Sequence, residues 1–179
     1  MTRRIGFLGG LAVMLATGTT FVGAAETLRI VPLTSNDRVV VTLEIADAYT
    51  DELRQAISSG MRTTFTYDIE LRMAVPTWVD RTIATATVSS SDQYDNLTRR
   101  HTLQRTVDGR VQDSLVTEDD AVAMQWLTTL TRVPLVDTSK LDASRDYYVR
   151  ISARARPHGG SLIGWASAVV GQAKFTFIP

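Results

Sequence analysis

The chain has 179 residues, and its 19 basic and 19 acidic side chains give a formal net charge of zero at pH 7. A balanced charge provides no bulk attraction to nucleic acid or to anionic lipid, so we do not expect either as a partner. The sequence contains no cysteine. That absence excludes disulfides, thiol catalysis, thiolate metal sites and iron–sulfur clusters, as well as a lipoprotein anchor.

The first 25 residues show the pattern of a secretory signal peptide. Arg3 and Arg4 precede an uncharged apolar run over residues 5–16, and small residues follow at positions 22–25. A positive end, a short apolar core and small residues before a cut are typical of exported proteins. We expect cleavage after Ala24 or Ala25.

Cleavage would leave residues 26–179 as one β-rich domain in the periplasm or outside the cell. Removing Arg3 and Arg4 from the 19 basic residues leaves 17 against 19 acidic residues, a formal charge of −2. The alternative is an uncleaved membrane anchor, because residues 5–25 form an uncharged stretch of 21 residues, which is long enough to span a bilayer.

Most of the remaining chain alternates apolar and polar residues with period two, which predicts half-buried strands. The clearest example is 63–73, where five apolar side chains from Phe65 to Met73 alternate with polar ones. Asp108-Gly109 predicts a hairpin between two such runs, and Pro76 predicts the end of another. The predicted strands are 28–33, 39–45, 63–73, 78–88, 94–107, 110–115, 147–155 and a short last strand at 175–177.

Two short helices interrupt the strands. For the first, Thr50 is the expected N-cap, three apolar residues from Leu53 to Ile57 share one face, and Gly60 is placed to end the helix. For the second, Thr117 is the expected start, with Asp120 three residues on. Its apolar face is expected to hold the side chains of Val122, Trp126, Leu127 and Leu130.

These elements predict a mainly β fold. We expect an antiparallel β-sandwich or flattened barrel of seven to nine strands, with the two helices packed at its edge or end. Trp78 and Trp126 are expected in its core.

Six motifs occur in order over residues 39–156 of the chain. They are Leu53-x-x-Ala56-Ile57-x-Ser59-Gly60, Thr64-Phe65-x-Tyr67 with Glu70, Trp78-x-Asp80, Tyr94-Asp95-x-Leu97-Thr98-Arg99-Arg100, Val133-Pro134-Leu135 and Tyr148-Val149-Arg150. Their order and spacing resemble the exported bacterial proteins of the domain of unknown function 4390 family. The resemblance implies a signal-bearing, single-domain envelope protein and carries over no catalytic or binding residues. Residues 159–171 depart from the family pattern, because they are rich in Gly and Ala where Pro and Trp are expected.

The side chains for common catalytic chemistry are sparse. Neither His101 nor His158 has a partner at metal-ligand spacing, so we expect an exposed or hydrogen-bonded ring at each position and no metal site. Asp68 and Glu70 lie two apart on one strand face, as a paired-carboxylate hydrolase would need. A solvated strand face, with both carboxylates paired to basic neighbours, is the interpretation we favour.

Arginines provide a sharper hypothesis. Arg150, Arg154 and Arg156 share one face of a predicted strand, and Arg99, Arg100 and Arg105 crowd another. If those strands were neighbours, the guanidinium groups could gather into a binding patch for an anionic ligand or an acidic partner. The simpler interpretation pairs them across strands with the nearby acidic residues Asp68, Glu70, Asp92 and Asp95.

A second candidate surface is the apolar segment 161–170, in which Leu162, Trp165 and Val169 could share one side. Exposed apolar segments often mark binding surfaces. The alternative is a strap that covers the open end of the core.

We therefore expect a non-enzymatic interaction or binding module of the bacterial envelope. Its partner would be another envelope protein, met through the arginine-bearing strands or through the segment 162–170. One alternative is a carrier that holds a small apolar or anionic ligand in a cavity between sheet and helices. Trp126 and the segment 162–170 would then line or gate this cavity. A hydrolase is the least supported alternative. We expect no cofactor, and membrane contact only if the N-terminal segment stays uncleaved.

Overall fold

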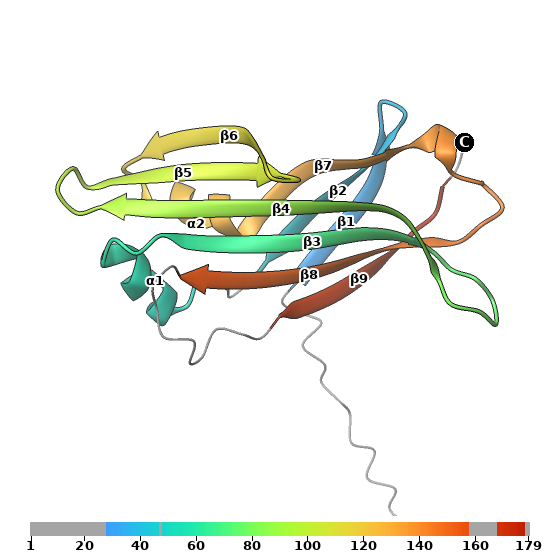
Figure 1. The fold of residues 1–179 in the computed structure, drawn as a ribbon, viewed down its shortest axis with the longest axis horizontal. Coiled ribbons are helices and arrows are strands. Elements are labelled where there is room, and N and C mark those ends of the chain that lie inside the picture. Colours follow the sequence, from blue (N-terminus) through green and yellow to red (C-terminus); the bar gives the residue numbers. More distant parts are fainter. Residues whose placement is uncertain (1–27, 47, 158–167, 178–179) are drawn as a thin grey trace, which may run out of the picture.

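The computed structural model describes residues 28–46, 48–157 and 168–177 (Figure 1). The predicted signal peptide lies outside these residues. So do Leu162 and Trp165 of the predicted apolar segment, and His158. Within the described residues, no helix has the length and apolar character needed to cross a membrane.

Nine antiparallel strands of the described chain form two sheets, which confirms the predicted sandwich. The larger sheet has six strands in the spatial order β6(Arg110–Thr117), β5(Arg100–Val107), β4(Arg81–Asp95), β3(Thr63–Met73), β8(Tyr147–Pro157) and β9(Val169–Phe175). The smaller sheet has three, in the order β1(Leu28–Ser35), β2(Arg38–Ile45) and β7(Thr129–Asp137).

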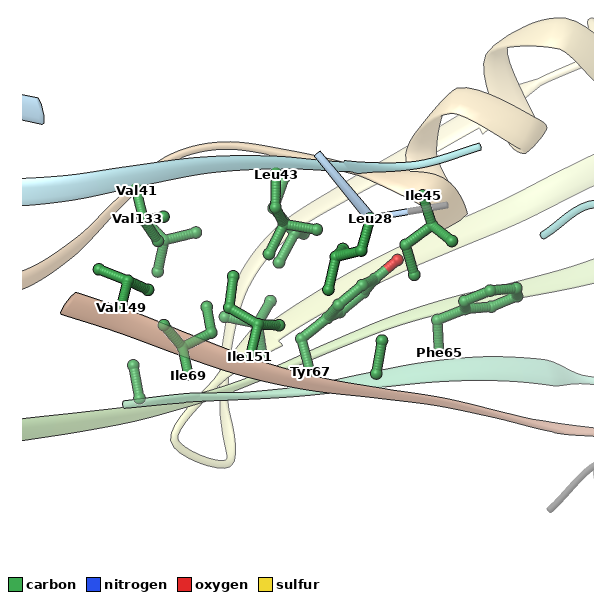
Figure 2. Packing of buried hydrophobic residues seen from close by; sticks show 14 of the residues in the cluster. Leu28, Val41, Leu43, Ile45, Phe65, Tyr67, Ile69, Val133, Val149 and Ile151 are labelled. Carbon is green, nitrogen blue, oxygen red and sulfur yellow. The ribbon is translucent and has the colours of Figure 1, made fainter. Parts of the chain in front are cut away.

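The core lies between the two sheets. Alternate residues of β3 point toward the smaller sheet, and Figure 2 shows Tyr67 and Ile69 facing Leu43 of β2 across the interface. Burying one face of each sheet removes a large apolar area from water and is the main stabilising term of such a fold. Apolar side chains of both sheets therefore form one continuous core between them.

The first helix, α1(Asp51–Ser58), forms as predicted at one end of the larger sheet (Figure 1). The Thr50 hydroxyl accepts a hydrogen bond from the Leu53 backbone N–H at 3.3 Å. Gly60 adopts a φ of +82°, the left-handed conformation that favours glycine, just after the helix ends.

The second helix, α2(Asp120–Thr128), differs from the prediction at both ends. Its N-cap is Asp119, whose carboxylate accepts from the Ala121 N–H at 2.8 Å, while Thr117 still belongs to β6. The helical spacing was extended wrongly to Leu130, which lies in β7 and pairs with Leu43. A short 3₁₀ helix, η2(Thr138–Lys140), follows β7.

Several strand predictions also need correction. The last strand, β9, covers Val169–Phe175, so the predicted strand 175–177 was placed too late in the chain. The predicted strand 78–88 begins only at Arg81, and Trp78 is 81% exposed in the preceding loop, so its placement in the core was wrong. The predicted strand 94–107 is broken by a turn after Asp95. Strand β7 was not predicted, because Pro134 interrupts its pattern; a bulged edge strand tolerates that proline.

Gly171 of β9 lies where the two sheets meet at one edge. A Cβ atom placed on Gly171 would lie 2.9 Å from a methyl carbon of Leu28 and 3.2 Å from one of Ile30, both on β1. The missing side chain therefore allows β1 and β9 to approach.

We expect Gly171→Val to destabilise the protein by about 1–3 kcal/mol, because a larger side chain overpacks this edge. The neighbouring Gln172→Val, on the exposed side of the same strand, is the matched control and should change stability by less than about 0.5 kcal/mol. Urea unfolding measures both. Equal effects of the two substitutions would contradict the close approach at Gly171.

Candidate functional site

The outer face of the six-stranded sheet is polar. The smaller sheet and α2 both lie on the inner side of the larger sheet (Figure 1). The outward residues of β3 alternate with its buried ones, and the register of β3 with β8 aligns them with the outward residues of β8. Residues 64–72 of β3 and 148–156 of β8 thus supply one continuous surface.

This surface carries more positive than negative charge. Its outward side chains on β3, β8 and β9 include two carboxylates, Asp68 and Glu70. The five cations on the same strands are Arg72, Arg150, Arg154, Arg156 and Lys174. Asp80, in the adjoining loop, adds a third carboxylate and accepts a hydrogen bond from the Tyr148 hydroxyl at 2.6 Å.

Both strand carboxylates contact arginines. Arg154 forms an ion pair with Asp68, and the Arg72 guanidinium lies 3.9 Å from Glu70. The cross-strand pairing expected for Arg154 is therefore present. Arg150 faces Glu70 in the register, yet within the described residues neither Arg150 nor Arg156 lies within ion-pair distance of a carboxylate.

A hollow of about 380 Å³ opens on this face beside Arg150. Asp68, Glu70 and Ser152 line it, and the exposed Val170 of β9 forms its apolar side. The hollow thus presents a guanidinium, two carboxylates and a methyl-bearing surface together. Val169, the one described residue of the predicted apolar trio, lies half-buried on the inner side of β9.

The arginines predicted on β5 do not join this surface. Strands β5 and β8 are separated by β4 and β3, so the two arginine groups do not gather into one patch. Arg99 lies in the β4–β5 turn with a φ of +56°, and Arg100 pairs with Glu118 at 3.0 Å. Arg105 points to the opposite, inner face.

Arg105 instead anchors the end of α2. Its Nη2 atom donates to the backbone carbonyls of Trp126 at 2.7 Å and Thr129 at 3.1 Å, and its Nε atom donates to the Ser90 hydroxyl at 3.1 Å. The guanidinium carbon lies 4.3 Å from the centre of the Trp126 ring. A cation at the C-terminal end of a helix stabilises the carbonyl groups that lack helical partners.

Tyr67 adds a second link to α2 from the core. Its hydroxyl donates a hydrogen bond to the Leu127 carbonyl. Burial raises the pKa of the Tyr67 phenol far above its ordinary value, so the hydroxyl keeps its proton and remains a donor at all physiological pH values. Two side chains of the larger sheet therefore hold the last turn of α2.

A buried polar cluster lies near the two helices. His101 of β5 is only 2% exposed; its Nδ1 atom lies 2.9 Å from Asp92 Oδ2, and its Nε2 atom lies 2.8 Å from Asp120 Oδ1. The Asp92 side chain has no exposed surface, whereas that of Asp120 is 86% exposed. The Tyr94 ring packs on the imidazole with centroids 4.7 Å apart.

The two hydrogen bonds of His101 require two protons among three groups. An ionised carboxylate only accepts, so either both ring nitrogens donate, or a protonated Asp92 donates to a neutral ring. Burial raises the pKa of the Asp92 carboxyl, and its hydrogen bond with His101 opposes part of that rise. Both ring nitrogens are engaged, so His101 links strands β4 and β5 to helix α2.

Asp92 was expected to pair with an arginine, and the buried cluster was not predicted. A signal for the cluster is nevertheless present in the alternation of the two strands. Residues Val88, Ser90 and Asp92 of β4 point inward, as do His101 and Leu103 of β5. A carboxylate and an imidazole at inward positions of two adjacent strands predict a buried contact between them.

Across the described residues, fold and surface define a nine-stranded antiparallel β-sandwich with one basic, outward sheet face. Residues 24–158 match the family model described as Domain of unknown function (DUF4390), and the chain belongs to this family. The match confirms the resemblance of the six motifs. No curated protein and no solved structure matches the chain.

Proposed function

We propose that the protein is a non-catalytic binding module of the bacterial cell envelope. In this proposal the N-terminal pattern directs export, and the outer face of the six-stranded sheet binds an acidic segment of another envelope protein. The N-terminal arginines, the apolar run after them and the small residues before Ala25 support export.

The observation that carries the binding proposal is the charge of the outer face. Five cations face two carboxylates on β3, β8 and β9, and the carboxylates contact Arg154 and Arg72. Arg150 and Arg156 keep donors available, and arginine suits carboxylate partners because its fork of N–H groups bonds in a bidentate way. An acidic peptide segment complements this surface in charge.

A hydrolase receives less support from the geometry. Asp68 accepts hydrogen bonds from Arg154 and from the Thr87 hydroxyl at 3.2 Å, and Glu70 lies beside Arg72. Asp68 and Glu70 therefore resemble carboxylates held by neighbouring side chains on an open sheet face, whereas an acid–base pair needs an enclosed cleft.

The test uses a photocrosslinking amino acid at Ser152, on the outer face, in cells that export the protein. We expect the captured protein to be joined through a peptide rich in Asp and Glu. Arg150→Glu with Arg156→Glu should abolish capture, because repulsion replaces attraction, and higher salt should weaken it.

Arg29→Glu with Arg110→Glu is the matched control, since both positions are exposed and the change in charge is the same. This variant should retain capture. Both variants should keep the melting temperature of the wild type. Loss of capture in both folded double variants would then overturn the proposal. Crosslinking through a peptide without acidic residues would also overturn it.

A further inference from the structure

A β-bulge shapes the end of the larger sheet beside the β3–β4 loop. The register slips between Leu71 and Arg72 of β3, which leaves Ile83 of β4 without a partner. Beyond the bulge, Arg81 lies opposite Met73, whose side chain packs against the core. Opposed residues of antiparallel strands share a face, so the extra residue turns Arg81 from the outer to the inner side.

The facing wall is η2 together with the segment that connects it to β8. The backbone N–H of Leu141 donates to the Thr138 carbonyl at 2.9 Å, and that of Arg145 donates to the Asp142 carbonyl at 3.1 Å. The Asp142 N–H donates to the Tyr147 hydroxyl at 2.9 Å. These bonds fix the backbone of the segment before any ligand arrives.

Between the two walls lies a cleft of about 520 Å³, a size suited to a small molecule. Three cations line it, Arg81 from the bulged strand and Lys140 and Arg145 from the opposite segment. Asp142 is the one carboxylate in the lining. Positive charge therefore exceeds negative charge by two in this cleft.

Asp142 does not neutralise the cleft. Its Oδ1 atom accepts hydrogen bonds from the Ser144 hydroxyl at 2.7 Å and the Ser144 N–H at 2.9 Å, and these bonds lower the pKa of its carboxyl. Its Oδ2 atom lies 3.8 Å from Arg145. Within the part of the chain that the structure describes, Arg81 and Lys140 form no ion pair.

The remaining lining of the cleft combines hydroxyl groups with apolar side chains. Ser139 and Thr82 are the hydroxyl-bearing residues of this lining, and Met73, Ile83 and Leu141 are its aliphatic ones. We propose that this cleft binds a small organic oxyanion, a carboxylate or a phosphate ester, whose short alkyl group packs on the apolar side chains. The site lies at the end of the sandwich and does not depend on the proposed function of the outer sheet face.

The test is a titration of the folded protein, monitored by calorimetry and by amide NMR shifts. The probes are hexyl phosphate, hexanoate, inorganic phosphate and the uncharged hexyl glucoside. We expect at least one of the two hexyl anions to bind at least tenfold more tightly than hexyl glucoside and inorganic phosphate. The largest shifts should fall on residues 81–83 and 139–145. Equal affinity for hexyl glucoside, or shifts confined to other surfaces, would overturn the proposal.

Arg81→Gln with Lys140→Gln should weaken binding of the hexyl anions at least tenfold. The matched control, Arg29→Gln with Arg110→Gln, removes the same charge from exposed positions away from the cleft and should bind as the wild type does. If the double variant unfolds, the single variant Lys140→Gln, in the 3₁₀ helix, replaces it in the test. This single substitution should weaken binding at least threefold. Wild-type affinity in a folded variant that lacks these cleft cations would overturn the proposal.

Discussion

Replacing His101 by alanine should destabilise the protein by about 3–5 kcal/mol, because the substitution leaves the buried Asp92 carboxylate without its partner. The Asp92 side chain has no exposed surface, and His101 supplies its hydrogen bond at 2.9 Å. Its other oxygen, Oδ1, is buried and has no hydrogen-bond partner among the described residues. The loss would be a large part of the 5–15 kcal/mol that stabilises a typical domain.

Asp120→Ala is the matched control for this prediction. Asp120 contacts the same imidazole at 2.8 Å, but its side chain is 86% exposed, so water can replace it at a cost of less than about 1 kcal/mol. Urea unfolding curves at pH 7 measure both variants. A loss in His101→Ala no greater than that in Asp120→Ala would contradict the view of a buried, paired carboxylate.

A double substitution separates two contributions to the free energy of unfolding. One is the penalty for leaving Asp92 buried without a partner, and the other is the net contribution of the Asp92–His101 pair. Asp92→Leu with His101→Phe replaces both buried polar groups by apolar ones of similar size, next to the Tyr94 ring. This variant should recover at least half of the stability lost in His101→Ala, because no unpaired charge remains. If the double variant is less stable than His101→Ala, the Asp92–His101 pair stabilises the fold by more than the cost of burying its two polar groups.

The sequence predicted single strands better than their ends. Five buried side chains of β3 alternate without interruption, so the prediction of 63–73 was confirmed in full. The break between β4 and β5 was missed, because the predicted strand 94–107 ran through it. The signal was local: the Asp95 carboxylate accepts from the N–H groups of Leu97 and Thr98, as aspartate often does in turns.

The arginine surface could be predicted only in part, because the order of the strands in the sheet was not known from the sequence. Alternation placed Arg150, Arg154 and Arg156 on one face of β8, and the structure has them there. Alternation along a single strand says nothing of which strands are neighbours, so the separation of β5 from β8 by two strands could not be read from it. Nor does the number of arginines show which of them face inward.

Arg105 is the arginine whose inward position can be tested most directly. We expect Arg105→Met to destabilise the protein by about 2–4 kcal/mol, since it removes charge-assisted hydrogen bonds to the Trp126 and Thr129 carbonyls and the stacking on the Trp126 ring. Arg105→Lys should recover less than half of the loss, because one ammonium group cannot reproduce the fork of donors.

Arg154→Met is the matched control, since Arg154 also contacts a carboxylate but lies on the exposed outer face. Its loss should stay below about 1 kcal/mol. Hydrogen exchange provides the second measurement: in Arg105→Met the amides of α2 should exchange faster than in the wild type, while those of β3 and β8 change only with global stability. Equal losses in the two variants, with unchanged exchange in α2, would mean that Arg105 does not hold the helix. Arg105 would then remain a candidate for binding, as the arginine pattern of the sequence first indicated.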